Sequence, residues 1–180
     1  MGKTYTGQSI EIGFEMSRCI HARNCFLRLP QVIDPNQRPW VQPDNASVEE
    51  ISAMILTCPS GALTFKRLDG AENEIAPGIN RVTVLENGPL AVNGALTVGA
   101  EEVTRVTLCR CGQTKNPPYC DYSHVEKAFA ASGEPDKTGK EVSSDAADPS
   151  LSISAFEDGP LMDHVPFEIS SCTGHGIEVV

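Results

Sequence analysis

The stretch CRCGQTKNPPYCDYSH, residues 109–124, gathers three cysteines and one histidine between a strand-like and a helix-like segment. Cys109 and Cys111 are two residues apart, so in an extended segment their side chains point to the same side. Cys120 and His124 are four residues apart and share one face of a helical turn. We therefore predict that these four side chains converge on one metal centre, across a loop kept compact by glycine and proline.

Two kinds of centre fit three thiolates and one imidazole. A zinc ion binds such a set tetrahedrally. A 2Fe-2S cluster places two ligands on each iron, so that one iron has two cysteines and the other has a cysteine and a histidine. The spacing alone leaves both centres open.

The stretch resembles the CDGSH iron-sulfur family, whose pattern is C-x-C-x2-S/T-x3-P-x-C-D-G-S/T-H. The ligand positions of that pattern are held by Cys109, Cys111, Cys120 and His124. The other pattern positions match at Thr114, Pro118, Asp121 and Ser123. Tyr122 departs from the pattern, because the family has glycine there, which puts the local backbone and the solvent cover in question. The resemblance implies a 2Fe-2S cluster on these four ligands, a β-rich cap around the hairpin and, commonly, a homodimer.

Histidine ligation has chemical consequences. Imidazole is neutral where thiolate is anionic, so His124 leaves the centre less negative and raises its reduction potential relative to an all-cysteine site. The second ring nitrogen can gain or lose a proton, which couples electron uptake to pH. Protonation of the metal-bound nitrogen would release the ligand. A redox carrier and a cluster donor therefore both remain open.

A second set of thiols lies near the N-terminus. In a bacterial ferredoxin the run C-x2-C-x2-C is followed by a distant Cys-Pro. Here Cys19 and Cys25 hold the outer positions, Ala22 replaces the middle ligand, and Cys58 precedes a proline. Three ligands predict a 3Fe-4S cluster, or a 4Fe-4S cluster if another group such as His21 or water caps the fourth iron. We expect His21 itself to face solvent or to support a ligand.

Residues 8–67 resemble the divergent mono-cluster ferredoxin domain that often accompanies CDGSH segments. The resemblance rests on CIHARNCFLRLPQVIDPNQRPWV, a following helix and CPSGAL. It implies that Cys19, Cys25 and Cys58 hold the cluster. The remaining cysteine, Cys172, has no thiol near it in sequence, so we expect it and His175 to be a strand residue and a loop residue.

Apolar periodicity sets the expected elements of the first part. Alternation over 10–16 predicts a half-buried strand, and a capping box of Ser47 and Glu50 predicts a helix from about 48 to 57. A returning strand follows at 62–65, and a break is expected near 69–78.

Short strands are expected from residue 81, and a short helix is expected in VEKAFAASG after the histidine. The segment 86–98 aligns without gaps with 157–169, which indicates an internal repeat of strand, Gly-Pro turn and strand. We predict an α+β fold: a small ferredoxin-like α/β module followed by a mainly β module that carries the CDGSH motif. The expected boundaries are a ferredoxin-like domain at 1–70, a CDGSH domain at 78–132, a polar connector at 133–150 and a second cap repeat at 151–180.

Composition limits the possible partners. The 180 residues carry a formal net charge of -10, which argues against binding to nucleic acid or an anionic membrane. No signal peptide or spanning segment is evident, so we expect a cytoplasmic protein. In a reducing compartment its seven cysteines are expected to serve as metal ligands in preference to forming disulfides. No catalytic pattern stands out. We therefore expect an electron carrier rather than an enzyme, with a redox protein or a cluster acceptor as its partner, as a monomer or a homodimer. A structural zinc protein is the weaker alternative.

Overall fold

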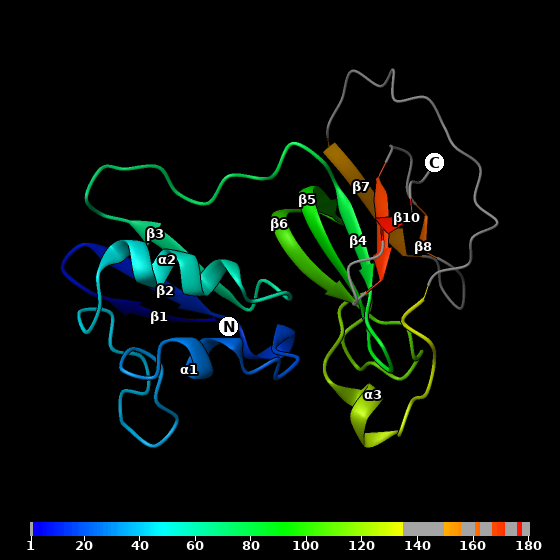
Figure 1. Cartoon of the computed structure of the whole chain (residues 1–180), viewed down its shortest axis with the longest axis horizontal. Coiled ribbons are helices and arrows are strands. Elements are labelled where there is room, and N and C mark those ends of the chain that lie inside the picture. The colour runs from blue at the N-terminus through cyan, green and yellow to red at the C-terminus, as the bar shows by residue number, and fades with distance from the viewer. Residues whose placement is uncertain (1, 135–149, 156–160, 163–166, 172–175, 178–180) are drawn as a thin grey trace. The chain divides into compact units, whose positions relative to one another are not determined.

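The computed structural model describes residues 2–134, 150–155, 161–162, 167–171 and 176–177. The chain divides into two compact units, Met1–Ile75 and Ala76–Val180. Its fold is α+β, with few short helices and two sheets, which confirms the predicted class (Figure 1). The finer boundaries expected inside the second unit stay predictions.

The first unit is built on a three-stranded antiparallel sheet. Its strands are β1 (Lys3–Thr6), β2 (Ile10–Phe14) and β3 (Leu63–Arg67), in the order β1-β2-β3. The predicted alternation in β2 is confirmed, since Ile10 and Ile12 are buried in the core. The short, mostly exposed β1 had no such alternation to reveal it.

Helices cover this sheet and position its thiols. Helix α2 (Val48–Leu56) starts at the predicted capping box, in which Ser47 and Glu50 each bond the other's backbone amide. Ile51 and Ile55 on α2 are fully buried in the core that the helix forms with the sheet. Two shorter helices, η1 (Met16–Arg18) and α1 (Asn24–Arg28), follow β2 along the chain.

The second unit is built on a larger sheet. Three strands precede the cluster motif: β4 (Arg81–Val84), β5 (Leu90–Val98) and β6 (Glu101–Leu108). Four more follow it: β7 (Ser150–Ala155), β8 (Leu161–Met162), β9 (Glu168–Ser171) and β10 (Gly176–Ile177). The order is β10-β9-β4-β5-β7-β8, with β6 paired to β5.

Strands from the C-terminal part of the chain extend this sheet. β7 pairs in parallel with β5, and β9 pairs in parallel with β4. Leu151 and Ile153 of β7 are buried in the same core as Val92 and Leu96 of β5. The Gly-Pro turn of the second copy lies outside the described residues.

The helix after the motif differs from the prediction. VEKAFAASG was expected to be helical, whereas α3 spans Ser123–Glu126 and so begins earlier and is shorter. Ala128 has φ 49°, a left-handed conformation that stops the helix before the expected glycine. His124 is therefore a residue of the helix itself.

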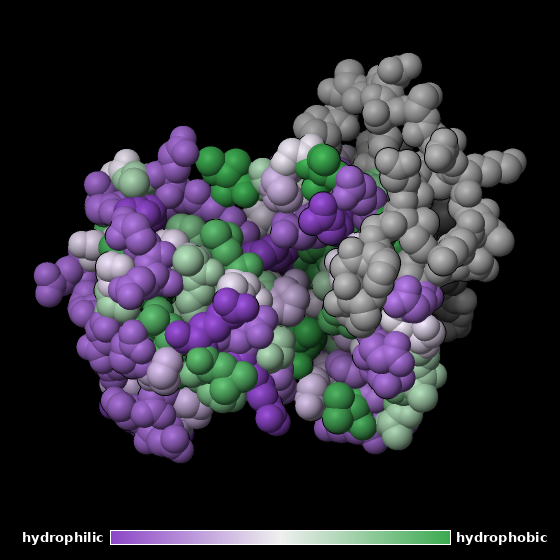
Figure 2. Space-filling view, viewed as in Figure 1, coloured by the Kyte–Doolittle hydropathy of each residue, from purple (hydrophilic) through white to green (hydrophobic). Residues whose placement is uncertain are grey.

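Among the described residues, none of the helices has the length and apolarity needed to cross a bilayer. On the face drawn in Figure 2, apolar side chains are interspersed with hydrophilic ones.

Candidate metal centres

The end of β6 continues into a tight hairpin that carries the CDGSH-like motif. The amide of Cys109 donates to the carbonyl oxygen of Pro118 at 2.9 Å, and the amide of Cys120 donates to that of Thr107 at 2.9 Å. An isolated bridge pairs Leu108 with Tyr119 between these two bonds. Cys109 and Cys120, eleven positions apart in the chain, are thereby brought to the same end of the sheet.

Side chains of the motif hold the loop between the cysteines. The hydroxyl of Thr114 donates to the carbonyl oxygen of Tyr119 at 2.7 Å. The Asp121 carboxylate accepts the amides of Lys115 at 2.8 Å and Ser123 at 3.1 Å. Burial raises the pKa of Asp121, but these amides and the Ser123 side chain outweigh it and lower the pKa to about 2. Asp121 is therefore an anion that fastens both ends of the loop.

The four predicted ligands lie as two pairs. Cys109 Sγ is 3.7 Å from Cys111 Sγ, and Cys120 Sγ is 3.3 Å from His124 Nδ1. Two thiolates on one tetrahedral metal at about 2.3 Å lie about 3.8 Å apart, and a thiolate and an imidazole nitrogen about 3.6 Å. Each pair therefore fits two ligands of a single metal atom. Two such pairs match the requirement of a 2Fe-2S cluster.

Burial governs the protonation of these ligands. It raises the pKa of the Cys120 thiol to about 11 and also raises that of Cys111, where neighbouring Cys109 adds to the effect. Burial lowers the pKa of His124, although the Asp121 carboxylate opposes that shift. The imidazole is thus kept neutral, which is the form that binds a metal. The thiols would become thiolates only where a cation compensates their charge.

Arg110, between Cys109 and Cys111, ties the hairpin to neighbouring turns. Its guanidinium donates to the carbonyl oxygens of Gly88 at 3.0 Å, Leu85 at 2.8 Å and Ser132 at 2.9 Å. Sequence reasoning missed this clamp. An arginine between two cysteines gives no signal of it, because its acceptors are backbone atoms more than twenty residues away.

Tyr122 explains why the family has glycine at this position. Its φ is 76°, in the left-handed region that a side chain disfavours by about 1–2 kcal/mol. The ring lies edge-on to the ring of His124, with centroids 5.4 Å apart. The departure from the pattern thus leaves the backbone conformation in place and adds an aromatic ring beside the predicted ligand.

The N-terminal thiols come from three successive elements of the first unit. Cys19 caps the end of η1, Cys25 lies in α1, and Cys58 follows α2. The amide side chain of Asn24 donates to the carbonyl oxygen of Thr57 at 2.7 Å, which fixes the start of α1 against the end of α2. All three cysteines are reduced and half-buried.

Burial and neighbouring charges both act on these thiols. Burial raises the pKa values of Cys19 and Cys25, and the charge of Cys58 raises both further. His21 is exposed and has φ 52°, and its Nδ1 lies 4.0 Å from Cys19 Sγ. The Ser60 hydroxyl lies 3.6 Å from Cys58 Sγ. The three thiols therefore share a site with a histidine and a hydroxyl close to them.

The donor set of the first unit suits a cluster of several irons. Within the described part of the chain, no three His, Cys, Asp or Glu side chains are arranged to hold a single metal ion. In a cubane each cysteine binds a different iron, so its ligands surround the cluster without sharing an ion. Three thiols are one fewer than a complete cubane set, which leaves 3Fe-4S and 4Fe-4S both open.

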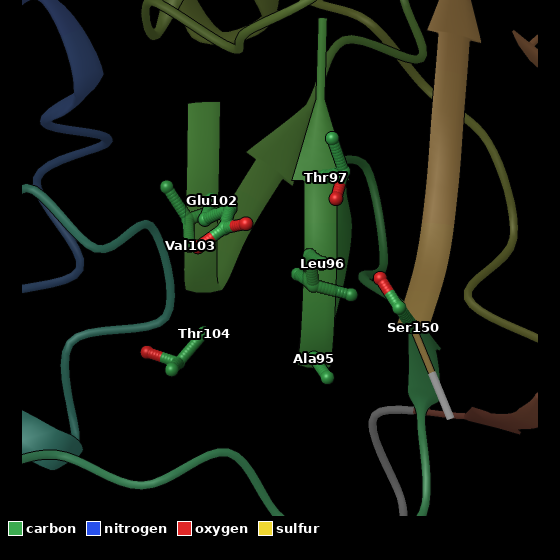
Figure 3. A pocket seen from close by; sticks show the side chains of 7 residues that line it. All are labelled: Ala95, Leu96, Thr97, Glu102, Val103, Thr104 and Ser150. Carbon is green, nitrogen blue, oxygen red and sulfur yellow. The ribbon is translucent and has the colours of Figure 1, made fainter. Parts of the chain in front are cut away.

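The remaining candidates are two C-terminal residues and one pocket. Cys172 and His175 fall outside the described residues. A shallow pocket of about 360 Å³ lies over β5, the start of β6 and Ser150 (Figure 3). Its lining contains Glu102 but no sulfur, and Val103 is ~20 Å along the strand from Cys109 at about 3.3 Å per residue. This pocket is therefore no part of the metal centres.

The aromatic residues Trp40 and Tyr5 pack against the core of the first unit. Trp40 meets the rings of Tyr5 and Phe14 edge-on, with centroids 5.9 and 4.8 Å apart. All three pack against the buried cluster of the first unit.

Comparison with known proteins matches each unit to an iron-binding family. Residues 5–68 match the family described as divergent 4Fe-4S mono-cluster, and residues 87–125 match the iron-binding zinc finger of CDGSH type. The chain is similar to the uncharacterized protein YjdI of Escherichia coli strain K12, with 34% identity over 64 residues, 36% of this chain and 84% of that protein. The same values hold for YjdI of Escherichia coli O157:H7. No solved structure matches.

Proposed function

Since the chain belongs to the divergent 4Fe-4S mono-cluster family and carries a CDGSH-type iron-binding domain after it, we propose that this iron-sulfur protein is a two-cluster electron carrier. The 2Fe-2S cluster would be held by Cys109, Cys111, Cys120 and His124. A 3Fe-4S cluster, or a 4Fe-4S cluster with a fourth ligand other than cysteine, would be held by Cys19, Cys25 and Cys58. When bound, such clusters take up and release single electrons.

The pairing of the donors in the second unit carries this proposal. Cys109 with Cys111 at 3.7 Å, and Cys120 with His124 at 3.3 Å, provide two ligands for each of two irons. The hairpin, the Asp121 carboxylate and the Arg110 guanidinium hold the backbone that carries these pairs. A rigid ligand set changes little between oxidation states, which favours electron exchange over ligand loss.

Exposure around the first site supports exchange with another protein. The thiols of Cys19 and Cys25 are half-buried, so a bound group would lie near the surface. Met16 and Leu27, close to them in sequence, are 64% and 68% exposed. Exposed apolar side chains beside a redox centre suit a transient protein contact. The chemistry belongs to the cofactors, so we propose a carrier and not an enzyme.

The test is to purify the full chain without oxygen and to measure iron, acid-labile sulfide, zinc and the electron paramagnetic resonance spectrum. We expect two cluster signals, of which Cys120→Ala removes one and Cys25→Ala the other. Reduction by a flavin or nicotinamide reductase, then reoxidation without loss of colour, supports the carrier. A colourless zinc-containing preparation without sulfide contradicts it and supports a structural zinc protein.

A second candidate function is storage, sensing or transfer of the 2Fe-2S cluster. The observation that favours it is the single neutral ligand, His124, whose proton uptake would open the site. In His124→Cys we expect much slower transfer to a metal-free acceptor and a more acid-resistant absorbance. Thermal unfolding of the metal-free chain serves as the control for misfolding. Unchanged transfer kinetics in the variant would rule this function out.

A further inference from the structure

One buried hydroxyl close to the second site has no partner. Thr107 is 2% exposed, and among the described residues its Oγ1 is the only buried side-chain oxygen or nitrogen without a hydrogen bond. Buried polar groups in proteins are nearly always paired, because an unpaired one loses its bonds to water and gains none in return. We therefore expect the hydrogen-bond acceptor of this hydroxyl to be an atom that does not belong to the polypeptide.

The backbone register places this hydroxyl on the same face as two of the predicted ligands. Leu108 is bridged to Tyr119, so the preceding residue of β6, Thr107, lies opposite Cys120, whose amide donates to the Thr107 carbonyl oxygen. Side chains two apart along a strand share a face, and directly opposite residues share a face as well. Thr107, Cys109 and Cys120 thus project to one side, while Leu108 projects into the apolar core on the other.

The cation between the two cysteines, Arg110, is committed elsewhere. Arg110 alternates with Cys109 and Cys111 along the chain. Its guanidinium donates to the carbonyl oxygens of Leu85, Gly88 and Ser132. It is therefore no donor to sulfur on the ligand face. The Thr107 hydroxyl lies on that face, and among the described residues it has no hydrogen-bond acceptor.

We propose that the Thr107 hydroxyl donates a hydrogen bond to a sulfur atom of the centre held between Cys109 and Cys120, and so positions and tunes it. This inference rests on the proposed 2Fe-2S function. Thiolate and sulfide sulfur both accept hydrogen bonds, and such bonds raise the reduction potential by stabilising negative charge on sulfur. Thr107 is a tuning residue and not a ligand.

The test compares Thr107→Val, which keeps the shape and removes the hydroxyl, with Thr107→Ser, which keeps the hydroxyl. In the intact full chain we expect Thr107→Val to shift the midpoint potential of the histidine-ligated centre to a more negative value. We also expect it to speed loss of the cluster absorbance roughly tenfold, the scale seen when a hydrogen-bond partner of a metal ligand is removed. Thr107→Ser should stay close to the wild type in both.

Unfolding of the metal-free full chain separates tuning from a structural role. Without metal the hydroxyl has no partner, so Thr107→Val should leave that stability unchanged or raise it. Lower metal-free stability with an unchanged potential and an unchanged decay rate would overturn the inference and point to a bound water. A Thr107→Val chain that folds but fails to load, while Thr107→Ser loads, supports it.

The two proposals can fail separately. Wild-type protein without iron and sulfide refutes the two-cluster function, and this inference falls with it. Wild-type protein that loads normally, beside a Thr107→Val variant of the same potential and lifetime, refutes this inference alone.

Discussion

At the scale of single residues, Tyr122 combines backbone strain with cover for a ligand. Its left-handed φ of 76° disfavours any side chain, whereas its ring packs edge-on to His124. We expect Tyr122→Gly to stabilise the metal-free chain by up to about 1 kcal/mol, since strain relief exceeds the entropy cost of glycine. Chemical denaturation measures this change.

The same substitution should shorten the lifetime of the bound centre, because the ring beside His124 is lost. Tyr122→Asn is the matched control, since asparagine tolerates the left-handed region better than tyrosine and also lacks the ring. Absorbance decay at constant pH measures the lifetime. Equal lifetimes in the wild type and both variants would show that the ring contributes no cover.

Asp121 offers a second residue-scale prediction. Asparagine has one acceptor oxygen, so Asp121→Asn can accept only one of the two amides, from Lys115 and Ser123, that the carboxylate binds. We expect a loss of about 1–2 kcal/mol in the metal-free chain at neutral pH, measured by urea unfolding. A loss that appears equally in Glu72→Gln, on an exposed loop of the other unit, would indicate a general charge effect instead.

The pH dependence of Asp121 has a definite sign. Its pKa falls from 3.8 to about 2 on folding, so its stabilisation is present above pH 3.8 and is lost as the pH falls toward 2. The metal-free wild type should therefore lose more stability over this interval than Asp121→Asn. Parallel stability curves for the two proteins would contradict the assignment.

The spacing of the motif predicted which side chains lie close together, and both pairs are close in the structure. Cysteines and a histidine at fixed spacing can be recognised in the sequence itself. The pairing of Cys109 with Cys111 and of Cys120 with His124 was therefore foreseeable. The Arg110 clamp and the unpaired Thr107 hydroxyl were not. The roles of these two residues depend on which backbone atoms and which strand face the fold places beside them. A local sequence pattern does not encode those neighbours.

At the scale of elements, the irregularity in β5 depends on a glycine. The register with β6 shifts between Asn93 and Leu96, and there the Asn80 side chain accepts the amide of Ala95 at 3.0 Å. A Cβ on Gly94 would meet the Asn80 amide oxygen and come within 3.0 Å of Asn80 Cα.

We therefore expect Gly94→Ala to destabilise the second unit by about 1–3 kcal/mol, because the contact involves backbone as well as side chain. Thermal unfolding measures the change. Gly78→Ala is the control, since a Cβ there has nothing within 4 Å. Similar effects of the two substitutions would show that crowding at the bulge is not the cause.

Elements with a strong local signal were predicted, and those defined by distant partners were not. Helix α2 is encoded by its own capping box and apolar face, so it forms where expected. Strand β1 is a polar edge strand that exists through its pairing with β2. The bulge in β5 arises because Asn80 approaches Gly94, which lies fourteen residues later in the chain. No repeat or periodicity in the sequence predicts this bulge.

At the scale of the whole molecule, each unit has its own buried core. Ile55 belongs to the core of the first unit, and Leu151 belongs to that of the second, although the chain reaches Leu151 only after the connector. Both residues are at most 1% exposed. The sheet accounts for this connection, because β7 and β9, which both follow the connector, pair in parallel with β5 and β4.

Separate cores predict separate unfolding transitions. We expect Leu151→Ala to destabilise only the unit that holds the CDGSH motif, by about 2–5 kcal/mol, because a buried leucine leaves a cavity. Ile55→Ala should destabilise only the ferredoxin-like unit, by a similar amount. Calorimetry of the metal-free chain, with cysteine-specific labelling of Cys25 and Cys120 to identify each transition, distinguishes the two. If either substitution lowers the midpoint temperatures of both transitions equally, the two units unfold together. The strands after the connector would then stabilise more than the sheet that they join.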